Sequence, residues 1–225
     1  MLLWNLDLLI EEPGIFFTVI PLAILALLPM LVIHEVSHGW VANWLGDDTA
    51  KVMGRLSLNP ITHLDRVGTI MLLLVGFGWA KPVPVNPNRL SIDPRKGMGI
   101  VGAAGPISNF VMAGVFSLLF RMDIVNLPDT LEGLNFSDVF AVLVFFIVQI
   151  NVILGVLNLL PVPPLDGFRI AVGFLPREQG LALARTERFA PQIILGLILL
   201  LMFTGFLWGI VDFLTSAFLG TDLYS

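Results

Sequence analysis

Long apolar runs divide this sequence into segments that can cross a lipid bilayer. Residues 14–45, 97–120, 136–160 and 193–218 each reach the length of about 20 residues that a spanning helix needs. The chain is 56% hydrophobic and only 13% charged, whereas soluble domains carry about 25% charged residues. A water-soluble globule of this size cannot hide so much apolar surface. We therefore predict an all-α membrane protein with about four transmembrane helices, forming a single domain over residues 1–225.

A shorter apolar run, residues 67–80, is followed by a segment rich in proline. The run is too short to cross the bilayer as a helix. Glycine at positions 76 and 78 and proline at positions 82, 84 and 87 disfavour a regular helix at its end. We expect a re-entrant or interfacial segment near residues 67–85.

The basic residues are distributed unevenly along the chain. If the short run does not cross, eleven of the 12 Lys and Arg residues fall on one side of the membrane, and Arg121 is the exception. Cytoplasmic loops carry such an excess of positive charge. The pattern predicts a multi-pass protein with both termini outside. The first dozen residues contain no Lys or Arg, so we expect no cleaved signal peptide there.

The motif HEVSH, residues 34–38, lies near the inner end of the first apolar segment. His34 and His38 are four residues apart, so a helix presents both imidazoles on one face toward a single metal ion. Glu35 follows the first histidine and can take a proton from the attacking water. Ionisable residues inside a membrane segment are costly and mark function by default. The chain has no cysteine, which excludes thiolate ligands and a cysteine nucleophile.

A second polar group follows the third apolar segment, in the sequence NLLPVPPLDG, residues 158–167. The prolines and the glycine should break the helix there. Asp166 is the natural third ligand, because zinc hydrolases use three protein ligands and leave one position open. The alternative for Asp166 is a helix-capping or turn residue. Asn158 carries an amide that can hold substrate backbone or stabilise an oxyanion, or it can bond a neighbouring helix.

These motifs resemble the site-2 protease family of intramembrane zinc metallopeptidases. HExxH within a membrane helix precedes NxxPxPxxDG on a later one, and GPISN, residues 105–109, resembles the family's GPxxN element. Residues 76–86 resemble the family's loop near the active site.

The resemblance implies one Zn²⁺ per chain and a set of residue roles. It implies that His34, His38 and Asp166 bind zinc, that Glu35 is general base and then acid, and that Asn158 aids substrate or transition-state binding. It also implies a transmembrane protein or peptide as substrate and the lipid bilayer as surroundings, with no nucleic acid partner. Some members carry PDZ or CBS domains, and we expect neither in these 225 residues. We expect a prokaryotic plasma membrane as its location, with the active site toward the cytoplasm.

Other interpretations remain open from the sequence alone. The same ligands could pass a divalent metal ion through a transporter, or a non-catalytic membrane partner could retain the motif. We expect His63 to be a solvated side chain in a polar loop. Asn109 fits helix packing and a supporting role at the site equally well. The series Gly97, Gly99, Gly102 and Gly105 predicts close helix packing.

Overall fold

A computed structural model describes residues 6–75, 78, 80–131 and 133–220. Three long helices dominate it: α2 (Pro13–Trp44), α5 (Pro94–Arg121) and α6 (Phe136–Leu159). The other elements are α1 (Leu6–Glu11), α3 (Thr49–Val52), η2 (Pro60–Thr62), α4 (Arg66–Val75), η3 (Pro87–Arg89), α7 (Asp166–Phe174), α8 (Arg177–Ala184), η4 (Arg185–Phe189), α9 (Ala190–Thr204) and α10 (Phe206–Leu219).

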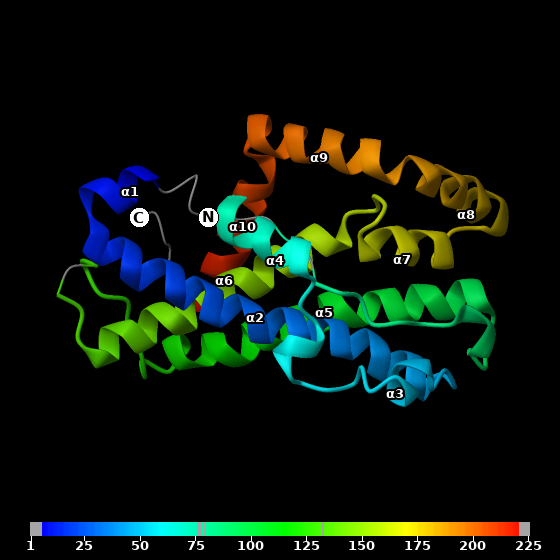
Figure 1. Cartoon of the computed structure of the whole chain (residues 1–225), viewed down its shortest axis with the longest axis horizontal. Coiled ribbons are helices and arrows are strands. Elements are labelled where there is room, and N and C mark those ends of the chain that lie inside the picture. Colours follow the sequence, from blue (N-terminus) through cyan, green and yellow to red (C-terminus); the bar gives the residue numbers. More distant parts are fainter. Residues whose placement is uncertain (1–5, 76–77, 79, 132, 221–225) are drawn as a thin grey trace.

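These three helices are long and apolar enough to cross a membrane, and they lie side by side along the long axis of the molecule (Figure 1). They contain 32, 28 and 24 residues. At 1.5 Å per residue, α2 is about 48 Å long, well beyond a hydrocarbon core of about 30 Å. Helix α5 packs against both α2 and α6, so it is the centre of the bundle. The prediction of an all-α membrane protein is confirmed.

The fourth expected span is not one continuous helix. The apolar stretch from 193 to 218 is divided into α9 and α10 at Gly205, whose φ of 62° lies in the left-handed region that favours glycine. Helix α10 packs against α5 and α6, where Ala113, Val148 and Val211 belong to one buried cluster. Three long helices and this divided segment are consistent with a count of about four.

The short apolar run forms α4, whose 10 residues span only about 15 Å. The two ends of the segment meet: the Lys81 N–H donates to the carbonyl oxygen of His63 at 2.7 Å, and Leu64 pairs with Ala80 as an antiparallel bridge. The segment therefore leaves and returns at one place, as a re-entrant or interfacial element must. Positions 76, 77 and 79 of the expected loop lie outside the described residues.

Polar side chains define where the long helices begin. Asn135 and Asp138 form a reciprocal capping box at the start of α6, and Asp93 accepts a hydrogen bond from the backbone N–H of Lys96 at the start of α5. Arg121, the basic residue that departs from the charge pattern, donates to the carbonyl oxygens of Phe218 and Ala217 at the end of α10. Its position is thus explained by helix capping.

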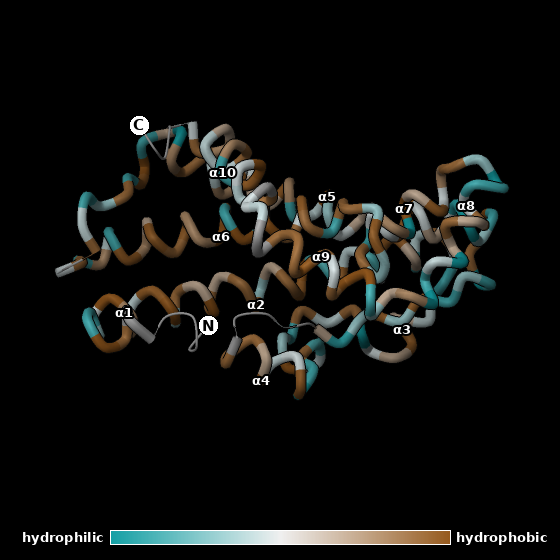
Figure 2. The backbone as a smooth tube through the Cα atoms, turned by 90° about the horizontal axis from the view of Figure 1, so that it is seen from above, coloured by the Kyte–Doolittle hydropathy of each residue, from teal (hydrophilic) through white to brown (hydrophobic). Residues whose placement is uncertain are grey.

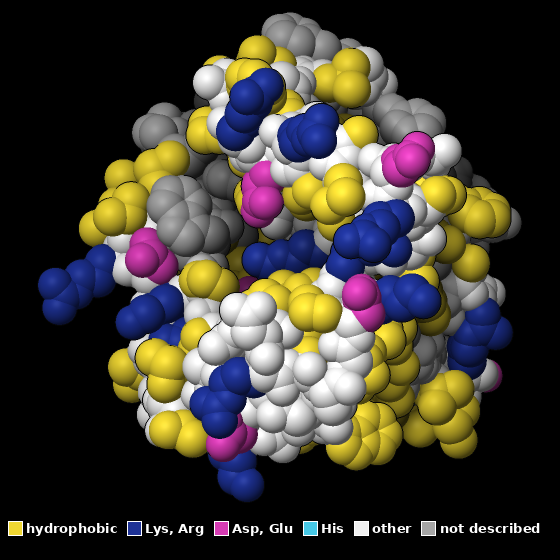
Figure 3. All heavy atoms as spheres, turned by 90° about the vertical axis from the view of Figure 1, so that its right-hand side faces the viewer, with side chains coloured by type: hydrophobic (Ala, Val, Ile, Leu, Met, Phe, Trp, Pro, Cys, Tyr) yellow, Lys and Arg dark blue, Asp and Glu magenta, His cyan; other side chains and the backbone are white. Residues whose placement is uncertain are grey.

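Hydrophobic and hydrophilic residues lie in different parts of the molecule. Hydrophobic residues run along the long helices, and hydrophilic residues gather around α3 and α8 (Figure 2). Lys and Arg side chains are concentrated on the end that carries these two helices (Figure 3). One end of the bundle is therefore basic, as the charge pattern predicts.

Candidate metal centre

Helix α2 brings two imidazoles together inside the bundle. His34 and His38 are both buried, and their Nε2 atoms are 3.2 Å apart. Both residues lie in the part of α2 nearest its C-terminal end, beside α5. The four-residue spacing therefore produces the convergence that the motif predicts.

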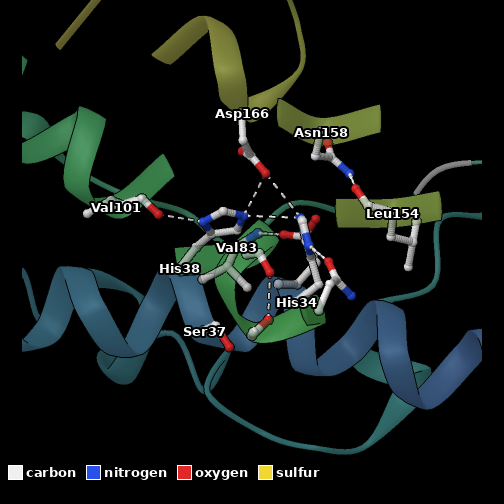
Figure 4. Close-up of polar contacts among 12 residues, drawn as sticks. His34, Ser37, His38, Val83, Val101, Leu154, Asn158 and Asp166 are labelled. Carbon is white, nitrogen blue, oxygen red and sulfur yellow. Dashed lines mark hydrogen bonds and ion pairs between the residues drawn. The ribbon is translucent and has the colours of Figure 1, made fainter. Parts of the chain in front are cut away.

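Asp166 completes the cluster from the opposite side. The prolines after α6 end that helix at Leu159, and Asp166 is the first residue of α7. Its Oδ2 atom lies 3.1 Å from Nε2 of His34 and 3.1 Å from Nε2 of His38 (Figure 4). The N-cap residue of α7 is Leu165, and Asp166 follows it in the first turn of the helix. Two distant segments of the chain thus converge on one point.

The second nitrogen of each imidazole has its own partner. His38 Nδ1 is 2.7 Å from the carbonyl oxygen of Val101, and His34 Nδ1 is 2.6 Å from Oδ1 of Asn109. A backbone carbonyl only accepts hydrogen bonds, so Nδ1 of His38 carries the proton and its Nε2 carries a lone pair. Metal-binding histidines in proteins are held in this way.

The three converging atoms fit a zinc ion. Ligands at 2.0–2.1 Å from zinc in tetrahedral geometry are about 3.3 Å from one another, close to the 3.1, 3.1 and 3.2 Å found here. Oδ2 of Asp166 is buried without a hydrogen-bond partner. Three acceptor atoms at this spacing repel one another unless a cation lies among them. Two imidazoles and a carboxylate are a usual ligand set for catalytic zinc.

Helix α5 packs against both imidazoles and against α7. A Cβ atom on Gly105 would lie 2.5 Å from His34 Cε1 and from His38 Nε2, so only glycine leaves room for the imidazoles. Gly99 and Gly173 bring α5 and α7 into backbone contact, because a Cβ on Gly173 would be 2.8 Å from the Gly99 Cα. The prediction of close helix packing holds for this pair. At Gly105 the close contact is with the side chains of His34 and His38 instead.

Glu35 faces a segment that we call the strap, residues 81–86. The Val83 N–H donates to Oε2 of Glu35 at 3.1 Å. The strap is held at both ends by charged side chains: Arg55 donates to the Lys81 carbonyl oxygen at 2.7 Å, and the Asn86 N–H donates to Oδ2 of Asp47 at 2.6 Å. The carboxylate of Glu35 is thereby oriented by backbone that two buried charges fix in place.

The structure agrees with some of the expectations for the other polar residues and not with others. Asn109 contacts His34, which decides in favour of a supporting role. His63 is 1% exposed and its Nε2 lies 2.7 Å from the Ser57 carbonyl oxygen, so the expectation of a solvated side chain is wrong. Asn158 lies on α6 beside the site, where its Nδ2 donates to the Leu154 carbonyl oxygen at 3.0 Å (Figure 4). Its role toward substrate remains a prediction.

Asn151 is a buried polar residue near the site that was not singled out from the sequence. Asn151 on α6 bonds Asn109 through its Oδ1 at 2.8 Å. An amide in the middle of an apolar span was the available signal, because polar groups in membrane helices are costly.

Comparison with known proteins agrees with the site. The sequence model of peptidase family M50 matches residues 22–131 and 122–202 of this chain. "Putative zinc metalloprotease YwhC" of Bacillus subtilis (strain 168) is 38% identical over 197 residues, covering 87% of this chain and 88% of that protein. "Putative zinc metalloprotease Rip2" of Mycobacterium tuberculosis (strain ATCC 25618 / H37Rv) is 29% identical over 212 residues, covering 90% and 76%. No solved structure matches the chain. The chain belongs to peptidase family M50, the site-2 protease family.

Proposed function

We propose that this chain is an intramembrane zinc endopeptidase that hydrolyses peptide bonds in or near transmembrane segments of other membrane proteins. The observation that carries the proposal is the convergence of His34 Nε2, His38 Nε2 and Asp166 Oδ2 within a membrane bundle. Membership of a peptidase family supports it, as do relatives named zinc metalloproteases. In this proposal His34, His38 and Asp166 hold one zinc ion per chain.

Zinc, when bound, makes water acidic enough to ionise near neutral pH and polarises the scissile carbonyl. Glu35 receives the proton of the attacking water on its carboxylate and then returns it to the leaving nitrogen. The Val83 N–H bonds Oε2 of Glu35, which holds the carboxylate in one orientation and leaves Oε1 for the proton. Asn158, next to the site on α6, is proposed to bond the backbone of the substrate.

We infer that the substrate is a transmembrane helix that unwinds locally, because the carbonyls of an intact helix are occupied by its own hydrogen bonds. The strap lies beside Glu35 without helical structure, and we propose that its backbone pairs with the unwound segment.

The site is proposed to face the cytoplasm of a prokaryotic cell. The basic end of the bundle is the end toward which His34 and His38 lie on α2, and positive charge favours the cytoplasmic side. The bacterial origin of two relatives supports a prokaryotic plasma membrane.

The test is Glu35→Gln, which keeps the size of the side chain and removes its proton-accepting charge. Tagged single-pass membrane proteins are co-expressed with the wild type, with Glu35→Gln and with Glu12→Gln, a control at the far end of the same helix. We expect fragments with the wild type and Glu12→Gln and none with Glu35→Gln, which should still bind zinc. Equal fragments with Glu35→Gln would exclude Glu35 from the reaction. Zinc flux into liposomes without fragments would favour a transporter.

A further inference from the structure

A chain of directed hydrogen bonds crosses all three spanning helices and ends at the metal centre. On α6, Nδ2 of Asn151 donates to the Ile147 carbonyl oxygen at 2.8 Å. From α5, Nδ2 of Asn109 donates to Oδ1 of Asn151 at 2.8 Å. On α2, Nδ1 of His34 lies 2.6 Å from Oδ1 of Asn109. We propose that Asn151 is a positioning residue that sets which nitrogen of His34 carries the proton, so that Nε2 keeps its lone pair for the metal. This inference rests on the proposed zinc site.

The direction of the chain is determined at its α6 end. A carbonyl oxygen can only accept, so Asn151 must turn its NH₂ group toward Ile147 and its oxygen toward Asn109. Asn109 must then present its own NH₂ group to that oxygen. Its remaining oxygen faces His34, so Nδ1 of His34 must be the donor.

The consequence reaches the metal because neutral imidazole carries only one proton. With the proton on Nδ1, the lone pair of His34 lies on Nε2, which points at Asp166 Oδ2 and at His38 Nε2. An amide group can turn over, since its oxygen and nitrogen have nearly the same shape. If Asn109 were reversed, it would donate to Nδ1, and the proton on Nε2 would block that atom as a ligand.

The two histidines differ in how this choice is enforced. His38 bonds a backbone carbonyl, that of Val101, which cannot change its role. His34 bonds a side-chain amide, which can donate as well as accept, so a further residue is needed to fix its direction. Asn151 is 0% exposed and Asn109 is 1% exposed, so water cannot take over this function.

Zinc affinity is the readout, because it reports on the ligands without requiring turnover. Zinc alone is titrated against a competing chelator, with purified full-length protein that carries Glu35→Gln. Asn151→Leu should weaken zinc binding about 10-fold or more, the usual effect of removing a partner of a metal-binding histidine. Ser117→Ala removes another buried hydrogen bond from α5 and should leave zinc affinity unchanged.

A second substitution separates positioning from packing. Asn109→Asp gives His34 a partner that accepts through either oxygen. The direction of the hydrogen bond between His34 and residue 109 then no longer depends on position 151. Zinc affinity of Asn109→Asp/Asn151→Leu should therefore return to within about threefold of the Asn109→Asp single variant, well inside the loss expected from Asn151→Leu alone. If Asn151→Leu does not fold, the comparison of Asn109→Asp with the double variant carries the test alone.

Two results would overturn the proposal: unchanged zinc affinity in Asn151→Leu, or a double variant that binds zinc as weakly as Asn151→Leu. In either case Asn151 would serve helix packing only. A parent protein that binds no zinc would instead refute the proposed zinc site, so the two failures are distinguishable.

Discussion

At the scale of single residues, the site depends on space as much as on ligands. Gly105 lies against both imidazoles, and any side chain there must displace them. Core groups cannot yield by more than a fraction of an ångström without cost, because protein interiors are close-packed.

Gly105→Ala should therefore lower zinc affinity about 10-fold or more and abolish detectable proteolysis. The added methyl group would lie 2.5 Å from His34 Cε1 and His38 Nε2. Chelator competition on the purified protein measures the change. Gly114→Ala is the matched control on the same helix, because its methyl group would meet Phe218 at an ordinary 3.6 Å. Wild-type zinc affinity in Gly105→Ala would show that the imidazoles are not confined as described.

The convergence of His34, His38 and Asp166 could be predicted from the sequence, because it depends on local spacing and on a break in a helix. His34 and His38 need only a helix to converge. Asp166 follows a series of prolines that end a helix, which an ordinary membrane span does not need. Gly105 and Asn151 could not be assigned in this way. Their importance depends on which helices touch, and α5 meets α2 and α6 only in the folded bundle.

At the scale of elements, α5 holds the third ligand in position through α7. Arg95 at the start of α5 donates to the carbonyl oxygens of Val172 and Leu175 at 3.0 and 2.7 Å, at the end of α7. A cation at a helix C-terminus stabilises the helix and fixes its direction. Asp166 is at the other end of α7, so we expect this contact to help fix its position.

Arg95→Met should weaken zinc binding several-fold while leaving the apolar stem of the side chain in place. Loss of two charge-assisted hydrogen bonds, worth about 1.5–3 kcal/mol each, would loosen α7 and the carboxylate it carries. Lys96→Met, an exposed neighbour, is the control. If both variants bind zinc equally well, α7 is positioned by the Gly99–Gly173 contact alone.

The strap is a second element whose position depends on buried charge. The carboxylate of Asp47 accepts hydrogen bonds from the Thr49 side chain and from the backbone N–H groups of Asn86 and Thr49. Desolvation opposes ionisation, but these hydrogen bonds outweigh it, so the pKa of Asp47 lies below its ordinary value of 3.8. A lowered folded-state pKa means that this stabilisation is complete above pH 3.8 and is lost as the pH falls through the folded value.

Asp47→Asn should lower the melting temperature at pH 7 by about 2–8 °C, for a loss of about 1–2 kcal/mol. The difference from wild type should shrink as the pH falls below 3.8, because the wild-type carboxyl then also becomes neutral. Thermal unfolding in detergent across this pH range measures both effects. Asp48→Asn removes only a half-exposed ion pair with Arg89 and should have little effect. A constant difference at all pH values would contradict the assigned charge.

At the scale of the whole molecule, the charge distribution predicts an orientation in the membrane. The absence of cysteine makes this directly testable, since any introduced cysteine is the single thiol of the chain. Asp129 lies in the exposed loop between α5 and α6, and Arg177 begins α8 at the basic end.

Asp129→Cys should react with a membrane-impermeant maleimide in intact cells, and Arg177→Cys should react only after the cells are opened. This result follows if the basic end lies in the cytoplasm, as we propose. Labelling of Arg177→Cys in intact cells would reverse the orientation and place the metal centre toward the outside.

The architecture was predictable where hydrophobicity alone decides it. The spans around α2, α5 and α6 follow from apolar length, and the short run around α4 follows from its inability to cross. The division of the last segment at Gly205 was not predictable in this way, because average hydropathy does not change where one residue adopts a left-handed backbone.

The most direct test of the account is the zinc content of the purified protein, measured by elemental analysis for the wild type, Asp166→Ala and Glu12→Gln. The account predicts one zinc per chain in the wild type and Glu12→Gln, and a small fraction of that in Asp166→Ala after dialysis against a chelator. Full zinc retention by Asp166→Ala, or a wild type that holds no zinc, would contradict it.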